Sequence, residues 1–160
     1  MDTSFFGDYA AYPDIFIDFV TKCRDHNITL VTIVPVVAEF TRGSETPDIY
    51  KKKTLLIKEI VGEHILSIHP NVFGKEVIKL VEEYGQTGKA VSITDYCLAA
   101  MTKIYKVDLC LLTKNPKDFP TSIFAVECYF LLQLNRALQV YGIYTFIDDS
   151  FASPEPEPPF

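Results

Sequence analysis

Apolar residues recur at spacings of three and four along several stretches of this chain, with short β-branched runs between them. The first pattern predicts amphipathic helices and the second predicts strands. Helices are predicted over residues 13–26, 36–40, 49–61, 72–84 and 131–141, with another that starts at Ser92 or Thr94 and includes Tyr105. Strands are predicted over residues 30–34, 64–68, 107–112, 123–129 and 142–147. These repeated strand–helix units predict the α/β class, as a three-layer α/β/α fold with a mainly parallel central sheet.

Composition indicates a single domain. The chain has 160 residues, of which 48% are hydrophobic, enough for one core over residues 1–150. Residues 151–160 are rich in Pro and Glu and are expected to form a disordered tail. The four cysteines are widely separated, so we expect them to be reduced core residues: Cys23, Cys97, Cys110 and Cys128.

The formal net charge of −6 argues against general electrostatic binding of nucleic acid, so any contact with a polyanion must be local. The candidate cations for such a contact are Arg42, Lys51, Lys52 and Lys53. The start of the sequence lacks the pattern of a signal peptide, and no apolar stretch reaches about 18 residues. We therefore expect a cytoplasmic protein without a membrane segment.

Three acidic residues lie just after a predicted strand or near the start of a predicted helix: Asp2, Glu39 and Asp95. Singly, each is typical of a solvated surface residue or a helix cap. In an open α/β sheet, however, such positions gather where ligands bind. Carboxylates that converge there bind hard cations such as Mg²⁺ or Mn²⁺. A metal-bound water can then attack phosphorus, which favours phosphodiester hydrolysis.

The order of the motifs resembles that of the PIN-domain family, and of VapC-type toxins in particular. The chain opens with Asp2-Thr3-Ser4, and Glu39 stands in Val-Ala-Glu-Phe followed by Arg-Gly. Asp95 then begins Asp-x-x-x-Ala-Ala, and Leu-Leu-Thr-x-Asn ends at Asn115, shortly before Asp118-Phe119. The resemblance covers residues 1 to 120.

What the resemblance implies is a metal-dependent endoribonuclease, the toxin of a toxin–antitoxin pair. The implied catalytic and metal-binding acids are Asp2, Glu39 and Asp95, with Asn115 and Asp118 as further metal ligands. Ser4 and Thr113 would orient carboxylates or waters. The implied partners are RNA, an antitoxin protein and a second copy that packs through the helix surface near Tyr50 to Val61.

Two departures from the family pattern leave other functions open. Only Met1 precedes Asp2, so the first strand of the predicted sheet is truncated, and the fourth acidic position of the family holds Asn115. One alternative is a non-catalytic module of the same fold that binds RNA or another protein. Another alternative is a structure-specific DNA nuclease.

Overall fold

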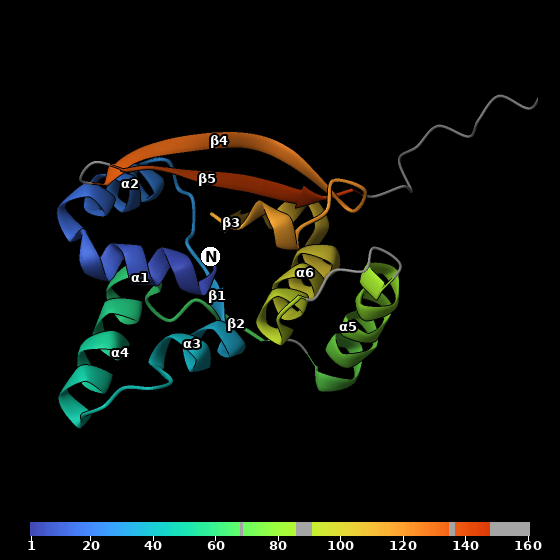
Figure 1. The fold of residues 1–160 in the computed structure, drawn as a ribbon, viewed down its shortest axis with the longest axis horizontal. Helices are drawn as coiled ribbons and strands as arrows, with labels where there is room; N and C mark the ends of the chain where they lie inside the picture. Colours follow the sequence, from blue (N-terminus) through green and yellow to red (C-terminus); the bar gives the residue numbers. More distant parts are fainter. Residues whose placement is uncertain (68, 86–90, 135–136, 148–160) are drawn as a thin grey trace, which may run out of the picture.

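The computed structural model describes residues 1–67, 69–85, 91–134 and 137–147 (Figure 1). The α-helices are α1 (Thr3–Ala11), α2 (Pro13–Asp25), α3 (Val34–Thr41), α4 (Pro47–Val61), α5 (Pro70–Gly85) and α6 (Ile93–Tyr105). The strands are β1 (Thr32–Ile33), β2 (Ile65–Leu66), β3 (Leu111–Thr113), β4 (Phe124–Leu134) and β5 (Ala137–Phe146). Two 3₁₀ turns flank β3, namely η1 (Lys106–Asp108) and η2 (Pro116–Asp118).

Local sequence explains where several helices begin. Pro13, Pro35 and Pro47 lie in the first turns of α2, α3 and α4, where a missing backbone N–H costs nothing. The Ser92 side chain caps α6 by accepting a hydrogen bond from the Asp95 backbone N–H. These predicted helices are confirmed, whereas α1 directly after Asp2 was not predicted.

The described strands form two sheets. β1 and β2 pair in parallel, and β3, β5 and β4 form an antiparallel sheet in the order β3-β5-β4. The α/β class is therefore confirmed. The described strands do not, however, join in one mainly parallel sheet, because strand pairing within the larger sheet is antiparallel throughout.

The prediction of a helix over residues 131–141 is wrong. Described residues on both sides of positions 135–136 belong to the long strands β4 and β5, which pair with each other from Phe124–Phe146 to Leu134–Ala137. Leu and Gln, common in this stretch, favour helices locally, but pairing across the hairpin overrides that preference. The predicted disordered tail, residues 151–160, lies outside the described residues.

Met1 and Asp2 lie between the two sheets. The Met1 amino group donates a hydrogen bond to the Val31 carbonyl beside β1 (3.1 Å), and the Asp2 backbone N–H donates to the Leu112 carbonyl in β3 (3.3 Å). These bonds place the start of the chain where a strand between β1 and β3 would run. In Figure 1 the N-terminus accordingly lies in the middle of the molecule, at the foot of α1. Residues 1–2 thus connect the two sheets through backbone hydrogen bonds, although they form no strand themselves.

Aromatic side chains from both ends of the chain form much of the core. The Phe130 ring stacks on Phe19 and on Tyr141, with centroid distances of 4.8 Å and 5.1 Å. Phe5 and Phe16 meet Tyr141 edge to face. These contacts fix the β4–β5 hairpin across α1 and α2, as Figure 1 shows.

Two expectations from composition have different outcomes. The cysteines are free, as predicted, but only Cys23 and Cys97 are buried; Cys110 and Cys128 are exposed because they lie outside the core. Within the described part of the chain, no helix combines the length and the apolar character needed to cross a membrane.

Candidate functional site

Asp2 is buried at the start of α1, and hydrogen bonds hold both of its carboxylate oxygens. Oδ1 accepts from the Ser4 hydroxyl (2.7 Å) and from the Phe5 backbone N–H (3.0 Å). Oδ2 accepts from the Thr113 hydroxyl (2.5 Å), which comes from β3. The structure therefore places Ser4 and Thr113 against Asp2, where they orient its carboxylate.

Glu39 projects from α3 toward the start of α1. Its Oε2 accepts a hydrogen bond from the Thr3 hydroxyl at 2.7 Å. Thr3 is the residue after Asp2, so this bond ties the second acid to the segment that carries the first. The Asp-Thr-Ser opening thus uses all three side chains: the acid itself and two hydroxyls that hold acids.

Asp95 lies in the first turn of α6, where its Oδ2 accepts a hydrogen bond from the Ser92 hydroxyl (2.6 Å). Burial raises the pKa of Asp95 from 3.8 to about 6, against the lowering effect of the Ser92 bond. The negative charges of Asp118, Asp2 and Glu39 raise the pKa further. Asp95 therefore lies within electrostatic reach of three other acids from different segments.

Asn115 and Asp118 close the site on the side of β3. The Asn115 backbone N–H donates to the Thr113 hydroxyl (3.0 Å), and the Asn115 side-chain amide donates to Asp118 Oδ2. A chain of hydrogen bonds thus runs from Asp2 through Thr113 and Asn115 to Asp118. In this arrangement Asn115 uses its amide to orient Asp118, and its side-chain oxygen is left as the group that can bind a ligand.

Three polar residues beside the acids were not predicted from the sequence. Lys114 Nζ contacts both carboxylate oxygens of Asp8 (2.9 Å and 2.7 Å), and the Tyr141 hydroxyl donates to Asp8 Oδ2 (2.7 Å). Burial and the Asp8 bond raise the pKa of Tyr141, with a further contribution from the charge of Asp2. The sequence signal was weak, because Tyr141 lies in a segment without any motif.

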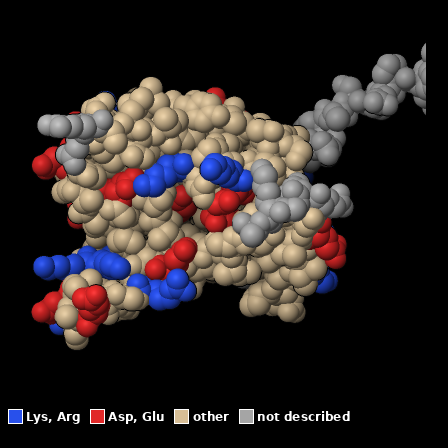
Figure 2. Space-filling view, viewed as in Figure 1, with Lys and Arg blue, Asp and Glu red and all other residues tan. Residues whose placement is uncertain are grey.

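Basic side chains flank the acids, but not all of those predicted to bind RNA are free. Lys53 Nζ donates to the Phe40 carbonyl at the end of α3 (2.7 Å) and lies over the Phe40 ring. Arg42, Lys51 and Lys52 are exposed. Figure 2 shows acidic side chains in a hollow in the middle of this face, with basic side chains above and below it.

The oxygen donors of the site are of the kind that hard cations prefer, but they are not already arranged as a set of metal ligands. Within the described ranges, no three His, Cys, Asp or Glu side chains lie close enough together to hold a metal ion. Asp2, Glu39 and Asp95 nevertheless have no basic ion-pair partner among these residues. Acids that repel one another gain stability from a cation between them, and Mg²⁺ usually keeps several of its waters as ligands.

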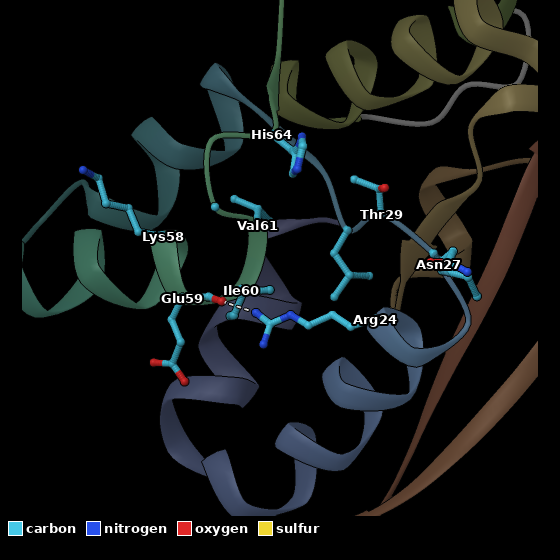
Figure 3. Close-up of a pocket in the computed structure, with 11 residues that line it drawn as sticks. Arg24, Asn27, Thr29, Lys58, Glu59, Ile60, Val61 and His64 are labelled. Atoms are coloured by element: carbon cyan, nitrogen blue, oxygen red, sulfur yellow. Dashed lines mark hydrogen bonds between the residues drawn. The ribbon is translucent and has the colours of Figure 1, made fainter.

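A separate cavity of about 480 Å³ lies between the end of α2, residues 27–30 and the end of α4 (Figure 3). Arg24 crosses it to donate a hydrogen bond to the Glu59 carbonyl (2.5 Å), while the Lys58 side chain points away. The Arg24 guanidinium is thus engaged with the end of α4. We assign no ligand to this cavity.

Comparisons with known proteins give no match: no family model, no curated protein and no solved structure is similar to this chain.

Proposed function

We propose that this protein is a divalent-metal-dependent endoribonuclease with a PIN-like site, and that it acts as the toxin of a toxin–antitoxin pair. The observation that carries the proposal is the electrostatic coupling of Asp95 to Asp2, Glu39 and Asp118. The four acids come from four separate segments of the chain. Their resemblance to the PIN motifs supports ribonuclease chemistry, and the antitoxin partner is proposed on that resemblance alone.

Each residue has a defined task in this proposal. Asp2, Glu39 and Asp95 would hold Mg²⁺ or Mn²⁺, which would supply an activated water and neutralise charge at the scissile phosphate. Ser4, Thr113 and Thr3 fix two of these carboxylates through the bonds described above. Asn115 and Asp118, which connect to Asp2 through Thr113, would orient water at the same site.

RNA has to approach an acidic centre on a molecule of net charge −6. The bound cation reverses the local field, and exposed cations at the rim contact flanking phosphates. Arg42, Lys51 and Lys52 have the exposure for this task. Lys53 has its amino group at the end of α3, so we assign it a structural task instead.

Cleavage of single-stranded RNA by the purified chain is the direct test. We expect cleavage with Mg²⁺ or Mn²⁺, none with EDTA, and a loss of at least about 100-fold in Asp95→Asn or Glu39→Gln. The matched control is Asp108→Asn, which changes an exposed acid on η1 outside the cluster. This variant should cleave like the unchanged chain.

Other outcomes decide between the alternatives. Undiminished cleavage in a folded Asp95→Asn variant would contradict the proposed site. RNA binding without turnover or metal dependence would indicate a non-catalytic module. Cleavage of branched DNA in preference to single-stranded RNA would indicate a structure-specific DNA nuclease.

A further inference from the structure

Lys114 lies at the edge of the acidic cluster, but it pairs with an acid outside that cluster. It follows Thr113, whose hydroxyl binds Asp2 (2.5 Å), and it precedes Asn115. The backbone of Lys114 is therefore fixed beside the acids. Its ammonium, however, lies 2.9 Å and 2.7 Å from the two carboxylate oxygens of Asp8 on α1. A positive charge is thus held next to Asp2 by a different carboxylate.

Tyr141 in turn holds Asp8. The Tyr141 hydroxyl donates a hydrogen bond to Asp8 Oδ2 (2.7 Å), and the Tyr141 ring is buried in the aromatic core. The charge of Asp2 contributes to the raised pKa of Tyr141, so these side chains lie within electrostatic reach of Asp2. Because a buried ring has little freedom to move, the carboxylate that it binds gives the Lys114 ammonium a defined position.

The ion pair also ties α1 to the turn after β3, but that structural task leaves part of the ammonium unused. The side chains of Lys114 and Asp8 are 31% and 18% exposed, so the pair is reached from solvent. An ammonium has three N–H donors. Two of them are directed at Asp8, and within the described residues the third has no acceptor. A phosphate oxygen is an acceptor of the right charge for this third donor.

The exposed cations of α3 and α4 are not fixed in this way. In the part of the chain that the structure describes, no hydrogen bond or ion pair holds the side chains of Arg42, Lys51 and Lys52. Ordering a long side chain on a ligand costs conformational entropy. Lys114 has already lost that freedom to Asp8, so it binds a phosphate at a smaller entropic cost than these three residues.

We propose that Lys114 is an RNA-binding residue of the candidate site, and that Asp8 and Tyr141 position its ammonium against the RNA backbone. The inference rests on the proposed function, which makes RNA the substrate. Since the ammonium pairs with Asp8 rather than with Asp2, the phosphate that it contacts is a neighbour of the scissile one. Figure 2 shows basic side chains directly above the acidic hollow, where a strand of RNA that crosses the acids would pass. Such a contact contributes to affinity and not to base specificity.

Fluorescence anisotropy with a short, labelled single-stranded RNA tests the contact. The Glu39→Gln chain is used with Mg²⁺, because cleavage there should be at least about 100-fold slower. In this chain Lys114→Gln should raise the dissociation constant at least about fivefold. It should also lower the slope of the logarithm of affinity against log salt by about 0.7, the value of one phosphate contact on a single strand. Lys114→Arg keeps the charge and should bind within about twofold.

Lys79→Gln is the matched control. Lys79 forms an ion pair with Glu76 (2.7 Å) within α5, on a different element from Lys114. Its replacement changes the net charge by the same amount, but it should leave the dissociation constant within about twofold and the salt slope unchanged. Equal losses of affinity in Lys79→Gln and Lys114→Gln would overturn the proposal, because net charge alone would then explain the binding.

Tyr141→Phe tests the positioning of Lys114, since it removes the hydroxyl from Asp8 and keeps the aromatic ring. In the chain that contains Lys114 it should raise the dissociation constant for RNA about two- to threefold, and in Lys114→Gln it should have no further effect. Far-ultraviolet circular dichroism of each variant checks the fold. Equal weakening with and without Lys114 would overturn the positioning role of Tyr141.

Cleavage kinetics separate this inference from the proposed function. In the otherwise unchanged chain, Lys114→Gln should raise KM and leave kcat within about threefold, because a contact with a neighbouring phosphate serves binding. If the chain cleaves no RNA but binds it through Lys114, the proposed function fails and the contact stands. If metal-dependent cleavage is found while Lys114→Gln binds RNA with unchanged affinity and salt slope, the contact is overturned and the proposed function stands.

Discussion

Hydroxyl groups hold three acids of the site, Asp2, Glu39 and Asp95, in the part of the chain that the structure describes. Ser4 and Thr113 bind Asp2, Thr3 binds Glu39, and Ser92 binds Asp95. A hydroxyl orients a carboxylate without neutralising it. The acids therefore keep their full charge and their mutual repulsion, which costs stability in the absence of a cation.

Burial of Asp95, together with this repulsion, predicts that Asp95→Asn stabilises the metal-free protein at pH 7. Because the pKa of Asp95 is raised from 3.8 to about 6, the folded state binds more protons than the unfolded state between these values, and stability falls as pH rises through them. Above pH 6 the full cost is present. With allowance for partial solvent exposure, Asp95→Asn should gain about 1–2 kcal/mol in urea unfolding at pH 7.

The gain should disappear below about pH 3, where Asp95 is protonated in both states, and Asp108→Asn should show no comparable gain at pH 7. Added Mn²⁺ should stabilise the unchanged chain more than Asp95→Asn, since a cation between the acids removes the repulsion. Equal stability of the two proteins at pH 7 without metal would contradict the coupling.

The acids were predictable from sequence because each one stands in a short local motif. Asp8 and its partners were not, since the Tyr141 hydroxyl that binds Asp8 lies 133 positions away. No spacing rule connects residues so far apart. For Thr113 the sequence predicted only that its hydroxyl would orient a carboxylate or a water, and not that it would bind Asp2.

At the scale of elements, α3 depends on a side chain from α4. The last carbonyls of a helix lack partners within the helix. Lys53 donates to one of them, that of Phe40, and places its ammonium over the Phe40 ring, 5.1 Å from the centroid. Glu39 precedes Phe40, so Lys53 also fixes the end of the helix that presents this acid.

Lys53→Ala should therefore lower the free energy of unfolding by about 1–2 kcal/mol, from the lost hydrogen bond and the cation–π contact. Lys52→Ala removes an exposed neighbouring charge and should change stability by less than about 0.5 kcal/mol. Urea unfolding of both variants measures the difference. If the two variants had equal stability, the interaction of Lys53 with α3 would be energetically unimportant.

Some of the helices can be predicted from the local sequence pattern alone. The spacing of apolar residues predicted α2, α3, α4 and α6, whose first turns are also stabilised by prolines or a capping residue within their own segments. Strands over residues 123–129 and 142–147 were predicted, but the helix predicted over residues 131–141 is wrong, because β4 and β5 are stabilised by each other and by Phe5, Phe16 and Phe19 from the other end of the chain. Their apolar runs fit a buried helix or a buried strand equally well.

At the scale of the whole molecule, the two sheets meet at Met1 and Asp2. Only 6% of Met1 is exposed, and its amino group has the Val31 carbonyl as hydrogen-bond acceptor. Burial lowers the pKa of this amino group from 8.0 to about 6, while the charge of Asp2 acts in the opposite direction. The junction between the sheets therefore contains a group that charges at moderately low pH.

Stability should consequently depend on the protonation of Met1. Between pH 8 and pH 6 the Met1 amino group binds a proton more readily in the unfolded state, so the free energy of unfolding decreases as pH falls. Acetylation of the Met1 amino group removes this pH dependence. At pH 6 the acetylated chain should be more stable by about 2 kcal/mol, and at pH 9 the two should be equal. Parallel stability curves from pH 6 to pH 9 would show that burial imposes no such cost.

The bonds from Asp2 to Thr113 and from Asp8 to Tyr141 join positions 111 and 133 residues apart. During synthesis, Asp2 and Asp8 are made long before Thr113 and Tyr141, whose hydroxyls bind them. Contacts between such distant segments form only after the intervening chain is available. A growing chain therefore carries acids that are still unassembled, and the RNA cleavage proposed for this site would begin only after β5 has been made and has packed.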